Sequence, residues 1–507
     1  MSHITIIKAA AVDLPKEPFN GRHMIDGVWL ASSDGATFER KSPSHGMVVS
    51  VSAKGGALEV DAAVAAARRA FDAGGWKHTS GKERAQVLHR VAGLIAGNIE
   101  RIALLETLES GKPIYQARAE IEGAVDLWRY AAALARTLHG DSHNALGSDM
   151  LGMILKEPVG VVSIITPWNF PFLIVSQKLP FALAAGCTAV VKPSELTPST
   201  TVILGEFLQE AGFPEGVVNI VLGYGDPVGA AMSTHADVDM VTFTGSTAVG
   251  KHIVAATSGT LKKVSLELGG KNPQVIFPDA DLDQAADAIV FGVYFNAGEC
   301  CNSGSRIIVH EDVVEALTEK VVALSKKVPF GDPLDPRTQV GAIISDAHNR
   351  KIDGYVNAAK DAGADILLGG KALDIDGLPG KFYMPTIVSN LSADMAIARE
   401  EVFGPVLSVL RFKDFDEAVT LANATSYGLS AGVWSENVHT CLAFAREVQA
   451  GTVWTNTWMD GYSEMPFGGV KESGLGRELG RYGLEEFLEV KSVLMRVGKT
   501  RVPWVAK

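Results

Sequence analysis

The segment from Phe295 to Arg306 contains the two side chains in this sequence that are best suited to nucleophilic chemistry. It reads FNAGECCNSGSR, so that Cys300 and Cys301 lie in a loop of small residues directly before an expected strand. A thiolate in a loop at the end of a strand can attack an electrophilic carbon. Most cysteines in proteins are buried and inert, and the local sequence does not exclude this alternative for Cys300 and Cys301.

Cysteine usage indicates a reducing compartment. The chain of 507 residues contains four cysteines, Cys187, Cys300, Cys301 and Cys441, which is too few for a disulfide framework. Adjacent cysteines are poor candidates for a structural disulfide, because a trans peptide holds their Cα atoms about 3.8 Å apart. We expect Cys187 and Cys441 to be buried and unreactive.

Composition limits the class of protein. The length predicts roughly three structural units, and 47% hydrophobic residues exclude a disordered chain. The net charge of −12 and the absence of a dense basic block argue against a nucleic-acid partner. Charges and turn residues interrupt every long apolar stretch, so no membrane span is expected. The first residues lack a signal-peptide pattern, which predicts a cytoplasmic location.

The first third of the chain is expected to be mainly helical. Apolar spacing predicts a helix over Val60–Phe71. Ser80 and Glu83 have the form of a capping box at the start of a second helix, and a third, from about Ile99, should stop at Gly111.

From residue 159, short β-rich runs alternate with helical patterns. The runs and helices are expected at 159–165, 176–185, 188–191, 199–210, 217–221, near 228, and at 238–242, 246–256 and 263–268. This alternation predicts right-handed βαβ crossovers and a doubly wound parallel sheet that binds a nucleotide. A second alternating block covers 280–455, with strands at 305–309 and 405–410, and 490–497 alternates like an edge strand.

Three glycine-rich segments imitate phosphate loops. The segment 245–252 nearly matches a P-loop, but His252 stands where that loop needs a hydroxyl group. The segments 223–229 and 474–480 are each one residue longer than the dinucleotide fingerprint. Gly225–Gly229 and Gly245 follow expected strands, where helix N-termini can hold a pyrophosphate; ordinary βα turns are the alternative.

Seven motifs occur in the order found in one enzyme family. They are TPWNFP from Thr166, KPSE from Lys192, FTGSTAVG from Phe243, LELGGKN from Leu266, GECC from Gly298, EEVFGP from Glu400 and PFGGVKESG from Pro466. On these motifs the chain resembles the NAD(P)-dependent aldehyde dehydrogenase superfamily. The aromatic positions Phe170, Phe295 and Phe467 make it most similar to the betaine-aldehyde and aminoaldehyde branch. The resemblance extends from about Ile25 to Val490.

The resemblance implies an α/β fold with a Rossmann-like, doubly wound cofactor domain, a second α/β catalytic domain and a small β oligomerisation extension. We expect the NAD-binding domain at 1–137 and 154–266, the catalytic domain at 267–482, and oligomerisation segments at 138–153 and 483–507. A hairpin at Leu138–Met153 and a strand at Val490–Val497 would pair across subunits of a homodimer or homotetramer.

Three residues are implied to carry the chemistry. The family pattern G-[QE]-x-C places the nucleophile at Cys301, 34 residues after Glu267 as in relatives. Thiolate attack on an aldehyde puts negative charge on the carbonyl oxygen, which the amide of Asn169 and the N–H of Cys301 would stabilise. Glu267 would activate the water that hydrolyses the thioester. Alone, Asn169 fits an Asx turn and Glu267 a solvated carboxylate.

Lys178 and Glu478 occupy positions that relay a proton from the general base in relatives. The relay requires that both be buried and joined through water; two surface charges are the alternative. A separate hypothesis concerns Cys300, which occupies the variable position of the motif. Peroxide could join Cys300 and Cys301 reversibly.

The resemblance implies NAD as cofactor and assigns no metal site. The residues nearest its ribose and phosphate groups would be Lys192 and Glu195 (adenosine ribose), Gly225, Gly229, Gly245 and Ser246 (pyrophosphate), and Glu401 and Phe403 (nicotinamide ribose). Glu195 favours NAD over NADP, because a carboxylate accepts hydrogen bonds from a free 2′-hydroxyl and repels a phosphate; Lys192 leaves use of both open. The other residues expected at this site are Ile165, Thr166, Pro167, Trp168, Ser194, Phe243, Thr244, Val249, Leu268 and Gly269.

The substrate pocket is expected to contain Phe170, Gln177, Phe295, Trp458 and Phe467. Three of these, the phenylalanines, match aromatic positions that enclose a quaternary ammonium in betaine-aldehyde dehydrogenases. Gln177 stands where those relatives have Trp and succinic-semialdehyde relatives tend to have Arg. We therefore expect a polar aldehyde, of amino or betaine type, with broad tolerance.

Three classes of function compete. A hydrolytic, NAD-linked aldehyde dehydrogenase is favoured, including one with broad aliphatic and aromatic specificity. A CoA-acylating relative usually lacks the general-base glutamate, so Glu267 argues against it. A non-catalytic binding protein is disfavoured by the intact Asn169, Glu267, Cys301 and Glu401.

Overall fold

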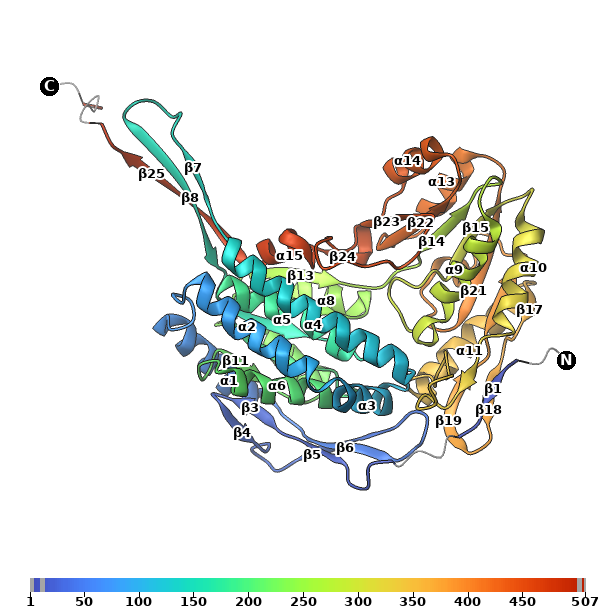
Figure 1. The fold of residues 1–507 in the computed structure, drawn as a ribbon, viewed down its shortest axis with the longest axis horizontal. Helices are drawn as coiled ribbons and strands as arrows, with labels where there is room; N and C mark the ends of the chain where they lie inside the picture. Colours follow the sequence, from blue (N-terminus) through green and yellow to red (C-terminus); the bar gives the residue numbers. More distant parts are fainter. Residues whose placement is uncertain (1–3, 10–13, 499–503, 506–507) are drawn as a thin grey trace.

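The computed structural model describes residues 4–9, 14–498 and 504–505. Two large sheets, each with helices packed against it, form two domains, and a β arm projects from the first (Figure 1). The α/β fold predicted from the alternating pattern is confirmed.

The first domain is built on an eight-stranded sheet. Its order is β24 (Gly474–Leu475), β13 (Lys263–Glu267), β12 (Met240–Thr244), β9 (Val161–Ile165), β10 (Thr188–Lys192), β11 (Val218–Ile220), β3 (His23–Ile25) and β4 (Val28–Leu30). The five strands from β13 to β11 are parallel. β24 and β3 pair antiparallel with β13 and β11, and the edge strand β4 pairs antiparallel with β3. All five residues of β9 and of β10 are buried, because helices cover both faces.

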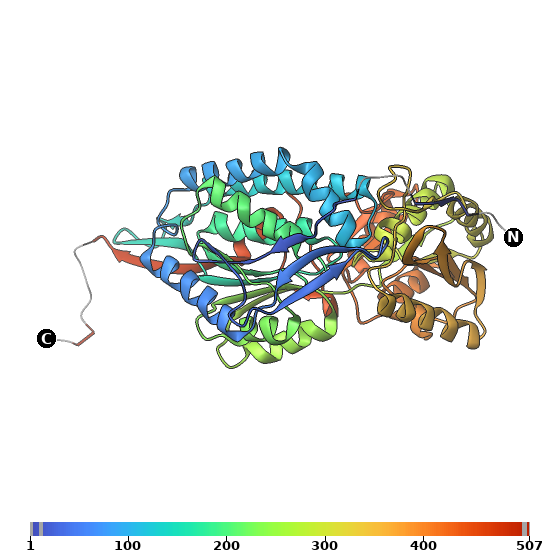
Figure 2. The ribbon, with the colours of Figure 1, turned by 90° about the horizontal axis from the view of Figure 1, so that it is seen from below.

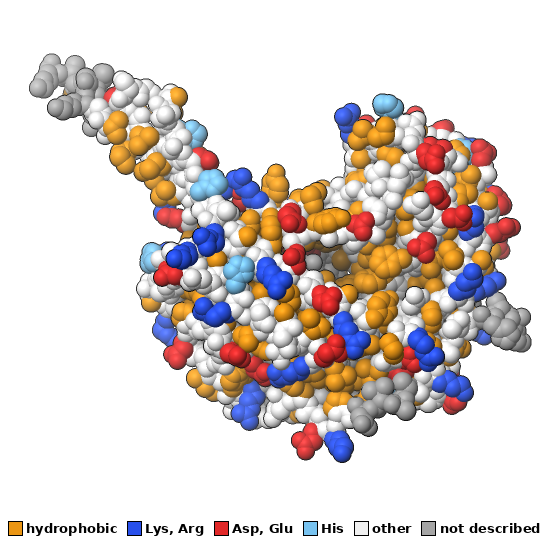
Figure 3. Space-filling model, viewed as in Figure 1, with side chains coloured by type: hydrophobic (Ala, Val, Ile, Leu, Met, Phe, Trp, Pro, Cys, Tyr) orange, Lys and Arg blue, Asp and Glu red, His pale blue; other side chains and the backbone are white. Residues whose placement is uncertain are grey.

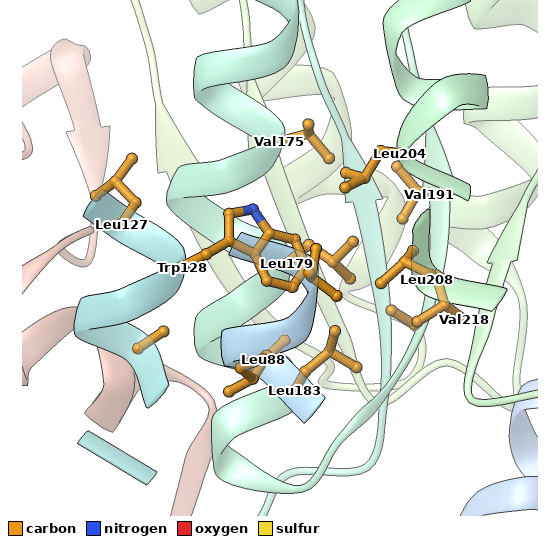
Figure 4. Packing of buried hydrophobic residues seen from close by; sticks show 14 of the residues in the cluster. Leu88, Leu127, Trp128, Val175, Leu179, Leu183, Val191, Leu204, Leu208 and Val218 are labelled. Carbon is orange, nitrogen blue, oxygen red and sulfur yellow. The ribbon is translucent and has the colours of Figure 1, made fainter. Parts of the chain in front are cut away.

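The helices lie on both sides of this sheet (Figure 2). One side has α2 (Gly81–Ala96), α3 (Ile99–Ser110), α4 (Ile114–Thr137), α5 (Pro171–Ala185) and α6 (Ser199–Ala211); the other has α1 (Ala57–Ala73), α7 (Ala230–Thr234) and α8 (Thr247–Thr257). Figure 4 shows how Trp128 of α4 and Leu179 of α5 meet in the core between the helices and the strands.

Local signals located most helix ends. Ser80 accepts a hydrogen bond from the backbone N–H of Glu83, and the Glu83 carboxylate accepts from that of Ser80, which is the predicted capping box. Gly111 ends α3 at φ 85°, where glycine is favoured. The prediction failed for α5, which begins at Pro171 rather than Ser176, because proline suits the first helical turn. The expected helical first third also contains β2 (Phe19–Gly21), β5 (Thr37–Lys41) and β6 (Val48–Ala53).

The second domain contains a seven-stranded sheet. Its order is β17 (Asp365–Leu368), β20 (Thr386–Ser389), β21 (Val406–Phe412), β15 (Arg306–His310), β14 (Pro273–Ile276), β22 (Ser430–Trp434) and β23 (Thr452–Thr455). The strands are parallel except at the β17–β20 edge. Its main helices are α9 (Leu282–Tyr294), α10 (Val314–Ser325), α11 (Asp346–Asp361), α13 (Phe415–Asn423) and α14 (Val438–Glu447).

The arm consists of β7 (Asp141–His143), β8 (Met150–Pro158) and β25 (Leu488–Arg496). β25 pairs antiparallel with β8 along its whole length, and the three strands extend away from both domains (Figure 1). The arm strand β8 runs to Pro158, beyond the limit of 153 expected for this segment, because its pairing with β25 continues to Leu488.

Three further segments cross the expected domain limits. β24 lies within 267–482 but joins the first sheet beside β13. Near the N-terminus, β1 (Ile6–Ile7) pairs with β16 (Phe330–Gly331) of the second domain. Helix α15 (Gly480–Glu486) packs on α5 of the first domain. Among the described residues, no helix is long and apolar enough to cross a membrane.

Candidate active site

The loop that carries Cys301 is held in an unusual backbone conformation. Asn296, Ala297 and Gly298 have φ of 51°, 56° and 73°, a left-handed run between α9 and β15. A side chain at Gly298 would collide with the carbonyl of Gly404, so the close approach requires glycine. The backbone strain that the two non-glycine residues carry is typical of functional loops.

The two adjacent thiols have different environments. Cys300 is 3% exposed, whereas Cys301 is partly exposed. The Cys300 thiol donates to the side-chain oxygen of Asn302 at 2.8 Å. Contact with the Cys300 thiol, followed by burial, raises the pKa of Cys301 well above its ordinary value. Cys301 is therefore the more exposed of the two residues, and with its raised pKa the thiol needs a base to lose its proton.

Asn169 lies against the backbone of the same loop. It is 4% exposed, and its side-chain amide donates to the carbonyl of Glu299 at 3.2 Å. Asn296 donates to the carbonyls of both Asn169 and Glu299 at 3.0 Å. These bonds hold the Asn169 amide, a potential oxyanion donor, beside the thiol loop.

Glu267 ends strand β13 as a buried carboxyl group with no hydrogen-bond partner among the described residues. It is 3% exposed. Burial raises its pKa well above the ordinary value; Glu478 and Cys301 add to the increase, and Lys178 opposes it. The alternative of a solvated strand carboxylate is wrong. An uncommitted carboxyl of raised pKa near a thiol suits a general base.

Lys178 and Glu478 form an ion pair, with side chains 0% and 6% exposed. Lys178 also donates to the hydroxyl of Thr242 at 3.0 Å. The condition that both residues be buried is met, and the surface-charge alternative is excluded.

Most residues expected at the cofactor lie at one edge of the first sheet. Thr166 to Trp168 follow β9, Lys192 ends β10 and is followed by Pro193 to Glu195, and Gly225–Gly229 follows β11. Phe243 to Ser246 and Leu268 to Gly269 lie at the same ends of β12 and β13. The carboxyl edge of a doubly wound sheet is where dinucleotides bind.

Polar groups at this edge fit a nucleotide. The hydroxyls of Thr166 and Thr244 are buried with no hydrogen-bond partner among the described residues. Lys192 lies 3.6 Å from the carboxylate of Glu195 and donates to the carbonyl of Pro193 at 3.0 Å. Ser246 is the N-cap of α8, and the free N–H groups of that turn suit a phosphate. A side chain at Gly225 would meet open space.

The second domain contributes Glu401 and Phe403. The Glu401 carboxylate accepts from the backbone N–H of Gly270 at 3.0 Å, and burial raises its pKa to about 7. The Phe403 ring packs edge-on against Trp168, with centroids 5.4 Å apart. The site therefore lies where the two domains meet, and Figure 3 shows a hollow between them on one face of the molecule.

Sequence reasoning missed His348 and Lys351 on α11. The His348 ring hydrogen-bonds to the carbonyl of Phe403 at 2.6 Å and lies 5.7 Å from the Trp168 ring. Lys351 donates to the carbonyl of Glu401 at 3.4 Å. No motif in the sequence marked either residue, since both reach the site only through folding.

An apolar cluster next to the thiols forms the candidate substrate pocket. Phe170, Ile174 and Cys300 are its buried members, and Leu173, Phe295 and Met459 pack against them. The rings of Phe170 and Phe295 stack with centroids 6.0 Å apart. Gln177 is partly buried one turn after Leu173 on α5, so the same helical face extends from the cluster to Gln177.

Two expected pocket residues, Trp458 and Phe467, are not members of this cluster. The indole of Trp458 is buried against Trp454, at 4.8 Å between centroids, and beside Gly292, Gly304 and Gly432, where only glycines leave room for it. The next residue, Met459, turns at φ 63° and reaches the pocket in its place. Phe467 packs against the main core of the first domain, and its backbone exchanges hydrogen bonds with that of Glu478.

The family model for the aldehyde dehydrogenase family matches residues 29–493. The chain belongs to this family. The enzyme is 41% identical over 481 residues to betaine aldehyde dehydrogenase of Bacillus subtilis, covering 95% of this chain and 98% of that protein. It is 41% identical over 499 residues to aldehyde dehydrogenase family 2 member C4 of Arabidopsis thaliana, with 98% of each covered.

Solved structures of aldehyde dehydrogenases have the same fold as this enzyme. An NAD-dependent aldehyde dehydrogenase from Sinorhizobium meliloti superposes with a TM-score of 0.97 at 50% identity, covering 99% of this enzyme and 100% of that chain. Betaine aldehyde dehydrogenase from Staphylococcus aureus in complex with NAD+ gives 0.93 at 40% identity, with 96% and 97% covered. The enzyme is an NAD-dependent oxidoreductase that acts on aldehydes. No group of acidic, His or Cys residues in the described part could hold a metal ion.

Proposed function

We propose that this enzyme oxidises an aldehyde to a carboxylic acid through a thiohemiacetal and a thioester on Cys301. The observation that carries the proposal is the buried carboxyl of Glu267, which has no hydrogen-bond partner among the described residues and whose charge interacts with Cys301. A base in this state serves both to take the thiol proton and to activate water.

The first half of the reaction uses Cys301 and Asn169. The Cys301 sulfur attacks the aldehyde carbon, and the amide of Asn169 with the backbone N–H of Cys301 stabilises the oxygen as it becomes negative. Bound NAD+ supplies the hydride acceptor. Loss of that hydride from the thiohemiacetal carbon would leave the acyl group on Cys301 as a thioester.

The second half uses Glu267, Lys178 and Glu478. Glu267 takes a proton from water, whose oxygen attacks the thioester carbon and displaces the Cys301 thiolate. The buried Lys178–Glu478 pair, whose charges interact with Glu267, is a route by which that proton leaves. The free carboxyl of Glu267 also disfavours a CoA-acylating reaction, which needs no activated water.

We assign cofactor contacts as expected from the sequence. Lys192 and Glu195 would bind the adenosine ribose, the turn at Gly225–Gly229 and the start of α8 the pyrophosphate, and Glu401 the nicotinamide ribose. The Glu195 carboxylate would repel a 2′-phosphate and so favours NAD. Lys192 lies beside Glu195 and offsets part of this repulsion. We therefore propose NAD as the preferred cofactor, with weaker use of NADP.

For the substrate we propose a polar aldehyde of amino or betaine type, with broad tolerance. The stacked Phe170 and Phe295 rings support a cationic head group. Gln177, beside Leu173 on α5, leaves one side of the cluster without a ring.

We also propose that the enzyme is a homo-oligomer in the cytoplasm. Exposed Val490 and Leu494 lie on one face of β25, the edge strand of the arm, and a second copy would cover them. All four cysteines are unpaired, which suits a reducing compartment. Light scattering tests the size: a monomer would overturn the oligomer proposal.

A panel of aldehydes assayed with NAD and with NADP tests the activity. We expect NADH and free acid from several aldehydes, a higher kcat/KM with NAD, and no acyl-CoA when CoA is added. Absence of NADH with every aldehyde, or acyl-CoA as the product, would overturn the proposal.

A further inference from the structure

A cluster of three charged side chains is buried behind the aromatic wall of the pocket. Lys112 lies in the turn between α3 and α4, and its ammonium donates to Glu106 of α3 at 3.3 Å and to Glu120 of α4. The side chains of Lys112 and Glu106 are 0% exposed and that of Glu120 is 5% exposed. Taking such charges out of water is costly, so an ion pair here is weak support for stability.

Both members of the Glu106–Lys112 pair contact the start of α5. The carboxylate of Glu106 accepts a hydrogen bond from the backbone N–H of Phe172 at 3.2 Å. That N–H belongs to the first turn of the helix, which has no partner within the helix. The ammonium of Lys112 lies 4.4 Å from the ring centroid of Phe170. The carboxylate of Glu106 thus holds the backbone at Phe172, and the ammonium of Lys112 holds the ring of Phe170.

The segment held in this way is the one that carries the proposed oxyanion donor. Asn169 directly precedes Phe170, and its amide donates to Glu299 in the thiol loop. Phe170 is itself the residue before the helix and stacks on Phe295 in the pocket. A shift of α5 relative to the loop would move the amide and the ring together.

We propose that Glu106 and Lys112 are positioning residues, which fix Asn169 and Phe170 against the Cys301 loop. The role of Asn169 within it rests on the proposed function. Without the ammonium, Glu106 would be a buried charge with no cation beside it, a costly arrangement that favours movement of the side chain away from the Phe172 N–H. A displacement of about 1 Å at a reacting group can cost about 10²-fold in rate.

Lys112→Met tests the proposal by two readouts. Hydrogen exchange of peptides covering 167–175 should become at least about tenfold faster, because the Phe172 N–H loses its acceptor. The rate constant of the NADH burst, counted per active site, should fall at least about tenfold, while the dissociation constant of NAD changes by less than about twofold. Lys112→Arg, which keeps the charge, should recover most of both.

Lys262→Met is the matched control, because Lys262 is also buried but donates to the carbonyls of His235 and Val238, away from the pocket. If Lys112→Met does not fold, Glu106→Gln leaves Lys112 paired with Glu120 and should still slow the burst by more than about threefold. Unchanged exchange at 167–175 overturns the proposal even if the wild type oxidises no aldehyde. Faster exchange with an unchanged burst overturns the link to Asn169.

Discussion

Lys178 and Glu478 form an ion pair with side chains 0% and 6% exposed, and the charge of each acts on the carboxyl of Glu267. Replacing one partner would leave a buried charge uncompensated, which destabilises a fold by about 3–5 kcal/mol. The pair is therefore best removed as a unit.

The double variant Lys178→Met with Glu478→Gln tests the proton route. We expect the NADH burst to keep its amplitude, because thioester formation does not use the pair, and steady-state turnover to fall about tenfold. Stopped-flow absorbance measures both. Glu485→Gln, at a partly buried ion pair with Lys156 on the arm strand β8, is the control. An unchanged turnover in the double variant would show that the pair is structural.

The raised pKa of Glu267 predicts how activity depends on pH. A protonated carboxyl cannot accept a proton from water, so turnover should rise about tenfold per pH unit below that raised pKa and level off above it. Glu267→Gln should lose this limb and turn over about 10²–10⁴-fold more slowly. Its NADH burst should also be slower, because Cys301 loses the base that takes its proton. Exposed Glu489→Gln is the control. A retained limb in Glu267→Gln would place the base elsewhere.

Asn169→Ala should slow the first half of the reaction. Removing one preorganised donor to a developing oxyanion costs about 10²–10³-fold in rate, so we expect a loss of that size in the burst rate constant with NAD binding unchanged. Rapid mixing with acetaldehyde measures it. Asn357→Ala, on an exposed face of α11, should have no effect. A burst as fast as that of the wild type would remove Asn169 from the oxyanion site.

Gln177→Trp should complete the aromatic wall of the pocket. A ring beside a desolvated ammonium contributes roughly 0.5–2 kcal/mol, so the KM for betaine aldehyde should fall about 2- to 30-fold, with that for propanal unchanged. Gln177→Leu, which removes the amide without adding a ring, is the matched control. Equal changes for both aldehydes would mean that the pocket does not bind a cation at this position.

Cys300→Ser tests the redox hypothesis for the vicinal thiols, which are in contact. We expect the wild type to regain activity with a thiol reductant after peroxide treatment, because Cys300 attacks the Cys301 sulfenic acid with loss of water. Cys300→Ser should instead lose activity permanently, and Cys441→Ser should behave as the wild type. If reversibility survives in Cys300→Ser, Cys300 does not protect its neighbour.

Local sequence determined much of this protein. The capping box at Ser80, the glycine that ends α3 and the β-rich runs of the first sheet depend on neighbours within a few residues, so their positions could be predicted. The family motifs also indicated Cys301, Asn169 and Glu267. Without those motifs, Asn169 would have been interpreted as part of an Asx turn and Glu267 as a solvated carboxylate.

The tertiary structure decided which contacts those residues make and how deeply they are buried. The sequence could not show that Glu267 lacks a hydrogen-bond partner among the described residues, or that His348 reaches Phe403. The sequence predicted Trp458 in the pocket. Its indole instead packs beside three glycines that are distant in sequence, and Met459 packs on the pocket cluster. Nothing in the sequence indicated that Lys112 reaches Phe170. Burial and close approach depend on segments far apart in the chain, and periodicity and spacing report only on neighbours.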